Sequence, residues 1–593
     1  MLPGWFVFAS ALAYLLLLFA VASYGDRKAK DPAAASRGRP MVYALSLAIY
    51  CTSWTYFGGV GLATTNGLEF AGIYIGPILM FTLGMPLIRR IVTLAKAERL
   101  TSIADFVAAR YGKNPGVAAI VAMISLIGAV PYIALQLKAV SSSVAAMVDT
   151  SRYELAALGG LVDLPLVVTL FLACFAIVFG TRHTDATEHQ DGLILAISME
   201  SVVKLVAFAS IGVYVLFFYL DGFGDLVERA ADSARVMSAL TYQTPIARWI
   251  LLIVLSAFAI IMLPRQFHVA VVENRTEGEL RMAGILLPLY LVAINIFVLP
   301  IAIGGVIAFD GTGDADLYVL TLPLANGQTF LTMVAFIGGF SAATAMVIVA
   351  SVALSIMVSN DIVIPTFLRR NLIGGEGPQE DLSRTLLRIR RLAIFFVLLL
   401  GYAYYRAATA NAGLASMGLL AFAAVAQVAP PLLGGLFWRN ANARGAMAGM
   451  ICGLVVWAYL LFLPSLGLSD NALIAETVLG FLFPGSTIFT GDNADPLVNA
   501  TLLATMVNIC AYVVGSLTRN PTSLERIQAN TFIRSKPRLE RAFRGRRTKV
   551  TVGDLKSTIA KYLGEERTNR SFHTYERQAG RWLRHARGFV RRL

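Results

Sequence analysis

The chain has 593 residues, of which 57% are hydrophobic and 15% are charged, and its formal net charge is +14. This composition excludes a soluble domain, and apolar stretches of about 20 residues exclude a closed barrel, whose strands are short and alternating. The basic residues lie between these stretches and in the C-terminal tail, so they indicate a topology signal at a lipid bilayer and no nucleic-acid partner.

Thirteen segments are apolar and long enough to cross a membrane, so the expected fold class is an all-α polytopic membrane protein. The expected spans are residues 3–24, 41–62, 70–95, 117–147, 162–180, 191–219, 246–266, 283–308, 329–357, 389–408, 413–436, 444–464 and 497–517. The four cysteines lie inside these spans without the paired spacing of metal ligands. Neither a firm metal site nor another cofactor is therefore expected.

Basic residues follow every second span. Arg27 and Lys28 follow the first span and Arg265 follows the seventh, whereas residues 310–327 and 464–496 contain acids and no Lys or Arg. The positive-inside rule then places the N-terminus outside and the C-terminus in the cytoplasm. The expected location is a bacterial inner membrane.

The 41–62 span contains residues that favour a local break. Gly58 and Gly59 lie among hydroxyl and aromatic side chains, and glycine lets a helix open its hydrogen-bond ladder at low cost. The alternative is that these glycines only permit close helix packing, which is common in membranes. The candidate solute-binding residues are Ser53, Trp54, Tyr56, Gly58 and Gly59, with Gln136 from the 117–147 span.

A second interruption is expected five spans later. Pro264 lies near the end of the 246–266 span and removes a backbone donor there. Because five is an odd number, a repeated five-helix unit has inverted topology, so spans two to six and seven to eleven are expected to form a 5+5 inverted repeat. Interrupted helices at corresponding positions of two such halves indicate a solute site near the middle of the membrane.

Three ionisable residues lie at membrane depth. Glu200 and Lys204 are spaced four apart within one span, and Lys138 lies in the 117–147 span. A charge at this depth costs about 3 kcal/mol on insertion scales, so each is a candidate for ion coupling through a proton relay or for solute contact. The alternatives are an internal Glu200–Lys204 ion pair and snorkelling of Lys138 toward the interface.

Three further motifs, Tyr132–Ala139, Gln266–His268 and Glu279–Ala283, resemble the sodium/solute symporter family, over residues 1 to about 520. The resemblance implies a thirteen-helix protein whose core is a LeuT-like inverted repeat with alternating access to a solute. It also implies a gating role for Pro264, Gln266 and His268.

The sodium site of that family is incomplete in this chain. Sodium-coupled members use a Ser/Thr pair of the ninth helix with backbone oxygens of the second, and alignment from Asp361 places this pair on Ala345 and Met346. A hard cation requires several oxygen ligands, so only a weak sodium site is expected. The nearby ion-coupling candidates are Ser341, Ala342 and Thr344, and proton coupling through Glu200, Lys204 or Lys138 is the preferred alternative.

The segments Tyr50–Thr55, Asp185–Glu188 and Pro264–His268 resemble more narrowly the transporter-like sensor region of CbrA-type bacterial histidine kinases. Residues 552–567 resemble the start of the small helical STAC domain that joins transporter to kinase in such proteins. The resemblance implies a transmembrane domain at 1–520, a basic juxtamembrane linker at 521–549 and a partial STAC-like domain at 550–593. A histidine kinase domain or a response regulator would then be a partner.

The leading hypothesis is a secondary transporter that moves a small polar solute, with an amino acid as the expected solute and protons preferred to sodium as the coupling ion. An enzyme is not expected, because the sequence contains no nucleophile with its base, no metal cluster and no cofactor fingerprint. The alternative is a solute-sensing receptor of a two-component system, in which occupancy shifts a conformational equilibrium.

Overall fold

A computed structural model describes residues 2–29, 38–148, 163–180, 190–369, 379–408, 413–467 and 495–533, together with Ser557, Glu565, Asn569 and Phe572. All regular secondary structure in these ranges is helical. The all-α expectation is therefore confirmed for the described residues.

The helices of the first part of the chain are mostly long, and several are interrupted by short 3₁₀ or π segments, marked η. They are α1 (Gly4–Ala29), α3 (Arg39–Ser46), η1 (Leu47–Tyr50), η2 (Trp54–Gly58), α4 (Gly59–Asn66), η3 (Gly67–Ala71), α5 (Gly72–Thr82), α6 (Met85–Glu98), α7 (Ile103–Arg110), α8 (Pro115–Met147), α9 (Leu164–Gly180), α10 (Asp191–Tyr214), η6 (Val215–Tyr219), α11 (Phe223–Asp232) and α12 (Ala234–Leu240).

The second part of the chain continues in the same way. Its helices are α13 (Ile246–Met262), α14 (Pro264–Phe267), η7 (His268–Val272), α15 (Glu277–Asn295), α16 (Val298–Phe309), η8 (Ala315–Leu317), α17 (Tyr318–Ala325), α18 (Thr329–Met357), η9 (Val358–Val363), α19 (Ile364–Arg369), α20 (Gln379–Ala407), α21 (Leu414–Val425), η10 (Ala426–Val428), α22 (Ala429–Phe437), α23 (Ala443–Trp457), η11 (Ala458–Phe462), α24 (Leu463–Ser465), α27 (Pro496–Leu517) and α28 (Ser523–Ile533).

Helix starts follow local sequence signals. Asn114 caps α8 by accepting hydrogen bonds from Gly116 N and Val117 N, directly before Pro115. Thr276 and Glu279 form a capping box at the start of α15. Both arrangements satisfy backbone donors that a first helical turn leaves free.

The membrane-crossing helices agree in position with the spans predicted from the sequence. The number of candidate spans in the structure is smaller than the predicted number. Eight described helices are long and apolar enough to cross a membrane, or up to ten if each of two bent pairs is one span. Every predicted range overlaps at least one described helix. The chain is thus a helical multi-pass membrane protein, while the count of thirteen stays a prediction.

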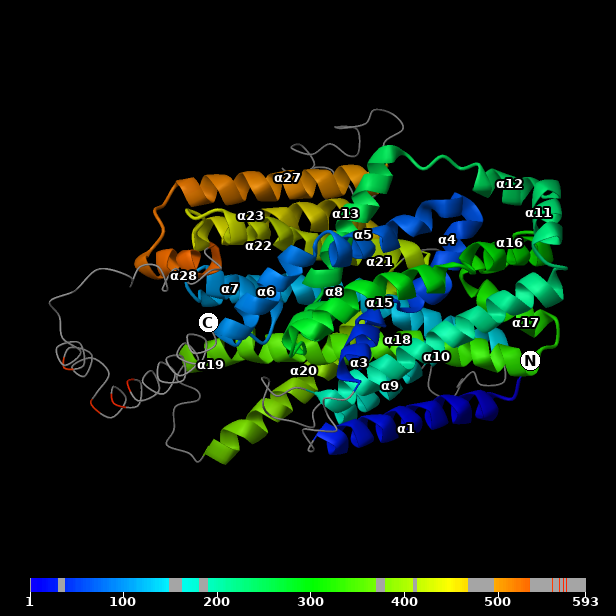
Figure 1. Cartoon of the computed structure of the whole chain (residues 1–593), viewed down its shortest axis with the longest axis horizontal. Helices are drawn as coiled ribbons and strands as arrows, with labels where there is room; N and C mark the ends of the chain where they lie inside the picture. The colour runs from blue at the N-terminus through cyan, green and yellow to red at the C-terminus, as the bar shows by residue number, and fades with distance from the viewer. Residues whose placement is uncertain are drawn as a thin grey trace, which may run out of the picture. The chain divides into compact units, whose positions relative to one another are not determined.

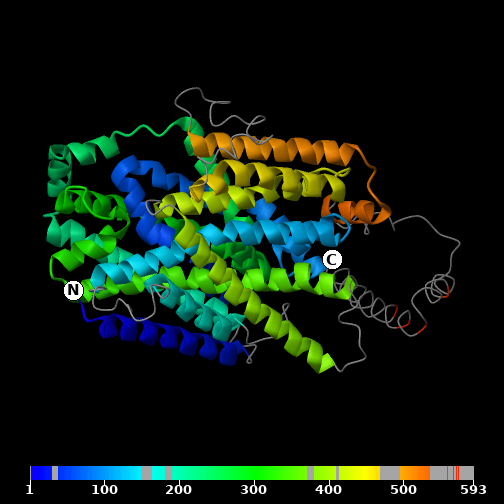
Figure 2. The same cartoon turned by 180° about the vertical axis from the view of Figure 1, so that it is seen from behind.

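The transmembrane unit has α8 and α18 in its interior. In α18 and the segments that follow it, 94% of the most apolar window is buried, against 33% for α1. Figure 1 shows α1 along one edge and α27 along the opposite edge, and the reverse view in Figure 2 agrees. The core therefore lies where α8 and α18 cross the molecule.

The two ends of this unit carry different elements. α11, α12 and α17 gather at the end where the chain begins, and α7 and α28 gather at the other end (Figure 1). Arg90 of α6 binds α28 at this end, because Arg90 Nη2 donates a hydrogen bond to Phe532 O at 2.7 Å.

The chain divides into two compact units, Met1–Ile533 and Arg534–Leu593. The second unit is described only at Ser557, Glu565, Asn569 and Phe572. Most of the predicted basic linker and nearly all of the predicted STAC-like domain therefore lie outside the described residues, as does the Asp185–Glu188 motif.

Candidate functional site

The first helix break lies at Cys51 and Thr52. η1 ends at Tyr50, Cys51 is extended with φ −78° and ψ 97°, and η2 begins at Trp54. Carbonyl groups of the turn before the break lose their intrahelical partners and need others.

This position corrects the sequence-based expectation of a break at Gly58 and Gly59. Both glycines are helical, with φ −63° and ψ −27° for Gly58 and φ −65° and ψ −38° for Gly59. A Cβ added to Gly58 would lie 3.1 Å from the Cβ of Leu414. The glycine at 58 therefore permits the close approach of α21, as the packing alternative proposed.

The second break lies at Leu263, as expected from Pro264. α13 ends at Met262, Leu263 is extended with φ −60° and ψ 132°, and Pro264 starts α14. The helices on either side are bent by 55°. Proline disfavours a helical residue before it, so the sequence signal and the observed break coincide.

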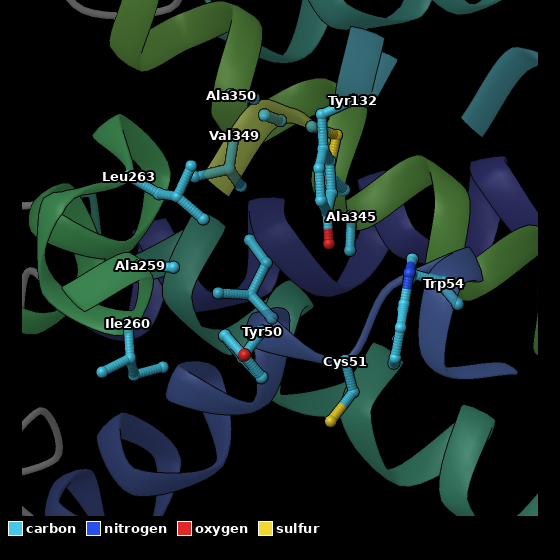
Figure 3. Close-up of a cluster of buried hydrophobic side chains, with 14 of the residues drawn as sticks. Tyr50, Cys51, Trp54, Tyr132, Ala259, Ile260, Leu263, Ala345, Val349 and Ala350 are labelled. Atoms are coloured by element: carbon cyan, nitrogen blue, oxygen red, sulfur yellow. The ribbon is translucent and has the colours of Figure 1, made fainter. Parts of the chain in front are cut away.

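α8 holds the first break in place. Gln136 Oε1 accepts a hydrogen bond from Ser53 N at 3.2 Å, and the Tyr132 hydroxyl lies 3.0 Å from Thr52 Oγ1. Figure 3 shows side chains from both breaks packed in one cluster with Tyr132, namely Tyr50, Cys51, Trp54 and Leu263. The predicted residues Ser53 and Gln136 are thus directly bonded at the break.

Lys204 of α10 occupies the break from the other side. Its Nζ donates to Ala48 O at 2.8 Å and to Cys51 O at 2.7 Å, and the side chain is fully buried. Two backbone carbonyls beside the broken helix are therefore bound by a positively charged group of the protein itself.

Glu200, one turn away on α10, binds α18 instead. Thr344 Oγ1 donates to Glu200 Oε1 at 3.0 Å, and Ser341 Oγ donates to Glu200 O at 3.2 Å. Within the described residues Glu200 and Lys204 are not in direct salt-bridge contact, although their opposite charges interact, so the ion-pair alternative stays a prediction. Each side chain turns to a different helix, where it finds its own hydrogen-bond partner.

The other ion-coupling candidates of α18 differ in what they offer. Ser341 accepts a hydrogen bond from Tyr14 OH at 2.8 Å, while Ala342 is buried and has no ligand atom in its side chain. Ala345 and Glu200 line a cavity of about 10 Å³ whose other side chains are hydrocarbon. This space is at the lower size limit for one water molecule, and apart from Glu200 its lining side chains supply no oxygen ligand.

Trp54 and Tyr56 have different surroundings. Trp54 Nε1 donates to Ala415 O at 3.1 Å, and Ala415 lines a cavity of about 740 Å³. Tyr56 packs with ring centroids 5.0 Å from Phe57 and 5.3 Å from Phe208. The structure therefore brings Trp54 to the wall of a large cavity and gives Tyr56 a packing role.

Lys138 interacts electrostatically with Asp316, which lies in η8 between α16 and α18 and outside the predicted spans. Burial raises the pKa of Asp316 to about 6, a hydrogen bond from Leu414 N lowers it, and the charge of Lys138 lowers it as well. Lys138 is half-buried. Its charge therefore interacts with an acid beside the large cavity, which Asp316 also lines.

The predicted gating residues lie buried at the second break. The Gln266 side chain is fully buried, and neither Oε1 nor Nε2 has a hydrogen-bond partner. His268 Nε2 lies 3.5 Å from Glu273 Oε1. Pro264 starts α14, which carries Gln266, and His268 begins the adjoining η7.

Arg265 is the residue that sequence reasoning misplaced. It was counted among cytoplasmic basic residues, but its side chain is buried, with Cζ 4.4 Å from the centroid of the Tyr132 ring. The available signal was its position between apolar residues, Leu263 before it and Val269 to Val272 after it. An arginine in such a run is expected at membrane depth.

The two sides of the breaks differ in access. On the side of α7, Arg39 bonds with Asp191, and its Nε lies 2.9 Å from Glu279 Oε1. Arg275 Nη2 also bonds with Asp191 at 2.8 Å. The cavity of about 740 Å³ lies on the opposite side, lined by residues of α4, η8 and α21. Ion pairs tie α3, α10 and α15 together on one side, while the other side has the cavity, at whose edge Arg248 pairs with Glu69 and Asp495.

Comparisons with known proteins identify related transporters. No family model matches the chain. The uncharacterized symporter YhjB of Bacillus subtilis is 24% identical over 497 residues, which are 83% of this chain and 92% of that protein. A second uncharacterized symporter of that organism, YodF, is 25% identical over 71% of this chain and 79% of its own length. A monocarboxylic acid transporter of Corynebacterium glutamicum is 30% identical over 39% of this chain and 38% of that protein.

Among solved structures, the substrate-bound, outward-open state of a Na⁺-coupled sialic acid symporter matches with a TM-score of 0.58 and 14% identity, over 87% of this chain and 98% of that chain. The likeness shows a shared fold. The chain is a multi-pass membrane protein with the fold of a symporter. Its sequence relatives are symporters and transporters, which places it with transport proteins and not with enzymes.

Proposed function

We propose that this protein is a secondary active transporter that binds a small polar solute where the two helix breaks meet α8 and α18, and moves it by ion-coupled alternating access. An amino acid is the expected solute, and protons are preferred to sodium as the coupling ion. The core is a LeuT-like 5+5 inverted repeat in this proposal, because the two breaks are separated by five predicted spans.

The observation that carries the proposal is the position of Lys204. In the sodium-coupled proteins that the sequence resembles, backbone oxygens of the second helix bind the ion together with hydroxyls of the ninth. Here the amine of Lys204 is bonded to two such backbone oxygens, of Ala48 and Cys51. In this proposal the ammonium group of Lys204 takes the place of a bound sodium ion.

A lysine can perform coupling because its charge is lost with one proton. The protonated amine has three donors and holds the carbonyl of Ala48 in η1 and that of Cys51 at the break. Loss of the proton removes the charge, which weakens this hold and lets the helix halves rearrange. Glu200, buried on the next turn of α10, is the second titratable group on this path.

The test is uptake of radiolabelled amino acids into proteoliposomes that carry either an inward proton gradient or an inward sodium gradient. We expect accumulation with the proton gradient alone. In Lys204→Met, accumulation is lost while exchange of labelled for unlabelled solute continues, because exchange needs the solute site and not the coupling group.

Lys113→Met is the matched control. Lys113 is exposed and lies 3.5 Å from Glu98, so its removal leaves accumulation unchanged. Accumulation driven by sodium alone, in wild type and in Lys204→Met alike, would contradict proton coupling through Lys204.

The alternative proposal is a solute-sensing receptor whose tail contacts a histidine kinase domain or a response regulator. It rests on the resemblance of residues 550–593 to a STAC domain and of the transmembrane motifs to CbrA-type sensors. It predicts specific solute binding without accumulation under either gradient. The same vesicles therefore separate the two functions.

The proposed arrangement in the cell is a bacterial inner membrane, with the α11–α12 end outside and the α7–α28 end in the cytoplasm. The domain boundaries at 520 and 549 belong to the same proposal. The large cavity then faces outward, and the Arg39 ion pairs close the cytoplasmic side.

A further inference from the structure

Arg265 is a buried cation at the second helix break. It follows Pro264 in α14, and its side chain is 2% exposed. Arginine keeps its charge under ordinary conditions because its delocalised guanidinium is not deprotonated in proteins. A full positive charge therefore lies inside the membrane domain.

The donors of Arg265 are largely unused. The guanidinium has one side-chain hydrogen bond, with Tyr132, whereas Nε and Nη2 have no partner, and among the described residues no carboxylate pairs with it. The Tyr132 ring, 4.4 Å from Cζ, provides a cation–π contact. Because a buried charge without an opposite charge is costly, the ring compensates only part of this cost.

Arg110 shows how the same chain satisfies a buried arginine elsewhere. Its side chain is also 2% exposed, but Nε donates to Gly435 O at 2.5 Å and Nη2 to Trp438 O at 2.9 Å. Only Nη1 of Arg110 lacks a partner, so Arg110 is a structural arginine. Arg265 has the same burial, but Tyr132 is its hydrogen-bond partner and both Nε and Nη2 have none, which indicates that a ligand completes the set.

The neighbouring charges add to the imbalance. The charge of Lys204 interacts unfavourably with that of Arg265, and Lys204 is already bonded to Ala48 O and Cys51 O. Glu200 is engaged with Thr344. Two cations and one anion therefore lie around the breaks, so a ligand with one negative charge would balance the site.

Unsatisfied neutral groups lie at both breaks. The side-chain oxygen of Ser53 and both amide atoms of Gln266 are buried without partners. A ligand that reached Arg265 would have further donors and acceptors available for its polar groups. The large cavity lies beyond Trp54, whose indole is bonded to the lining residue Ala415, so a ligand from that cavity would have to pass Trp54.

We propose that the solute carries a carboxylate group and that Arg265 binds this group through its guanidinium fork. The proposal rests on the proposed function, whose solute class it narrows. Arginine suits the task because its parallel N–H groups match the two oxygens of a carboxylate. An uncharged analogue would leave the guanidinium buried and unpaired, so the site discriminates against it.

The test measures ligand-induced shifts of the unfolding temperature for the full chain in nanodiscs at constant chloride concentration. The probes are acetate, pyruvate and L-alanine, each compared with an uncharged or amide counterpart, acetamide, pyruvamide and L-alaninamide, and glucose is the neutral solute. We expect stabilisation by at least one carboxylate and none by its amide. In Arg265→Gln and in Arg265→Lys, the carboxylate affinity falls about 100-fold.

Stability without ligand separates a binding role from a structural one. Arg265→Gln removes an unpaired charge, so the ligand-free unfolding temperature stays equal or rises. Arg110→Gln removes a paired arginine and lowers the ligand-free unfolding temperature, while carboxylate affinity is kept. A large loss of ligand-free stability in Arg265→Gln would assign Arg265 a structural role and overturn the proposal.

Other outcomes overturn the proposal in distinguishable ways. Equal shifts by chloride and carboxylates, equal shifts by acids and amides, unchanged affinity in Arg265→Gln, or no shift with any carboxylate would each contradict it. Gradient-driven uptake of glucose that Arg265→Gln leaves intact would keep the transporter and reject the carboxylate. Binding that depends on Arg265 without accumulation would keep the carboxylate and reject transport.

Discussion

Lys204 and Arg265 are both buried cations near the helix breaks, and they differ in how their charge is compensated. Lys204 has two carbonyl partners from the chain, whereas two nitrogens of Arg265 have none. A residue whose partners are internal contributes to the resting structure. A buried residue with unbonded donors destabilises the ligand-free protein, and it stabilises the complex when a ligand bonds to those donors.

Thr344 provides a test of the polar contact between α10 and α18. Its hydroxyl donates to Glu200 Oε1 at 3.0 Å, so Thr344→Val leaves a buried carboxylate without that partner. We expect a loss of about 1–3 kcal/mol in unfolding free energy, measured by thermal or denaturant unfolding. Thr332→Val, which removes only a bond to Gln328 O, is the control, and an equal loss there would contradict a special role for Glu200.

Asp316 makes the stability of the folded chain depend on pH. Burial raises the pKa of this carboxyl to about 6 in the folded chain, above its usual 3.8, so the folded state binds the proton more tightly. The charged form therefore costs stability above pH 6, and this cost is relieved as the pH falls from 6 toward 4.

The measurement compares wild type with Asp316→Asn. The amide oxygen still accepts from Leu414 N, and the charge is gone, so the variant gains about 2 kcal/mol at pH 7 and nothing at pH 4. Hydrogen exchange at Leu414 N reports this locally. Identical pH profiles for both proteins would show that Asp316 does not titrate in this range.

At the scale of elements, the two breaks have different causes. Leu263 is extended because proline follows it, and the sequence displays this cause directly. The break at Cys51 and Thr52 has no glycine or proline. It is stabilised by Lys204 from α10 and by Gln136 from α8, which are distant in sequence, so only the folded chain reveals it.

The candidate residues also divide into those that the sequence identifies and those that only the folded chain reveals. Ser53 and Gln136 were found together because both are polar in apolar spans, and the structure joins them. Gly58 was assigned to a break because glycine permits either a break or close packing, and sequence does not distinguish these. Arg265 was missed because a basic residue near a span end is also a topology signal.

The contact between α23 and α27 depends on small residues. Gly445, Gly449 and Gly453 are spaced four apart on α23, and a Cβ on Gly449 would lie 2.7 Å from Asn508 Oδ1 and 2.8 Å from Asn508 O. Gly449→Leu therefore separates the helices and costs about 3 kcal/mol. The measurement is the unfolding temperature.

Gly224→Leu is the matched control, because a side chain on Gly224 of α11 meets open space. Solute affinity is unchanged in any Gly449→Leu protein that remains folded, since neither α23 nor α27 contributes a residue to either break. Equal stability of the two variants would argue against close packing of α23 on α27.

At the scale of the whole molecule, hydropathy was sufficient to locate the spans, because a bilayer imposes their length and composition. Their ends and their grouping into continuous or bent helices depend on packing, which explains why eight to ten candidate spans stand beside thirteen predicted ones. The orientation is a prediction from charge alone.

Cysteine labelling tests the orientation. Ser238→Cys lies in α12 and Ser523→Cys begins α28, and both positions are exposed. We expect a membrane-impermeant maleimide to label position 238 in intact cells and position 523 only after lysis. The reverse pattern would invert the assignment of the two ends.

The bond between Lys204 and the carbonyls of Ala48 and Cys51 has a consequence for where such a protein is useful. In the proposed proton-coupled mechanism, a transporter that carries its own cation draws nothing from the sodium content of the medium. A bacterium that relied on such a transporter for a carbon or nitrogen source would grow on it equally well at low and at high sodium concentration. A protonophore would stop this growth at once, and removal of sodium would not.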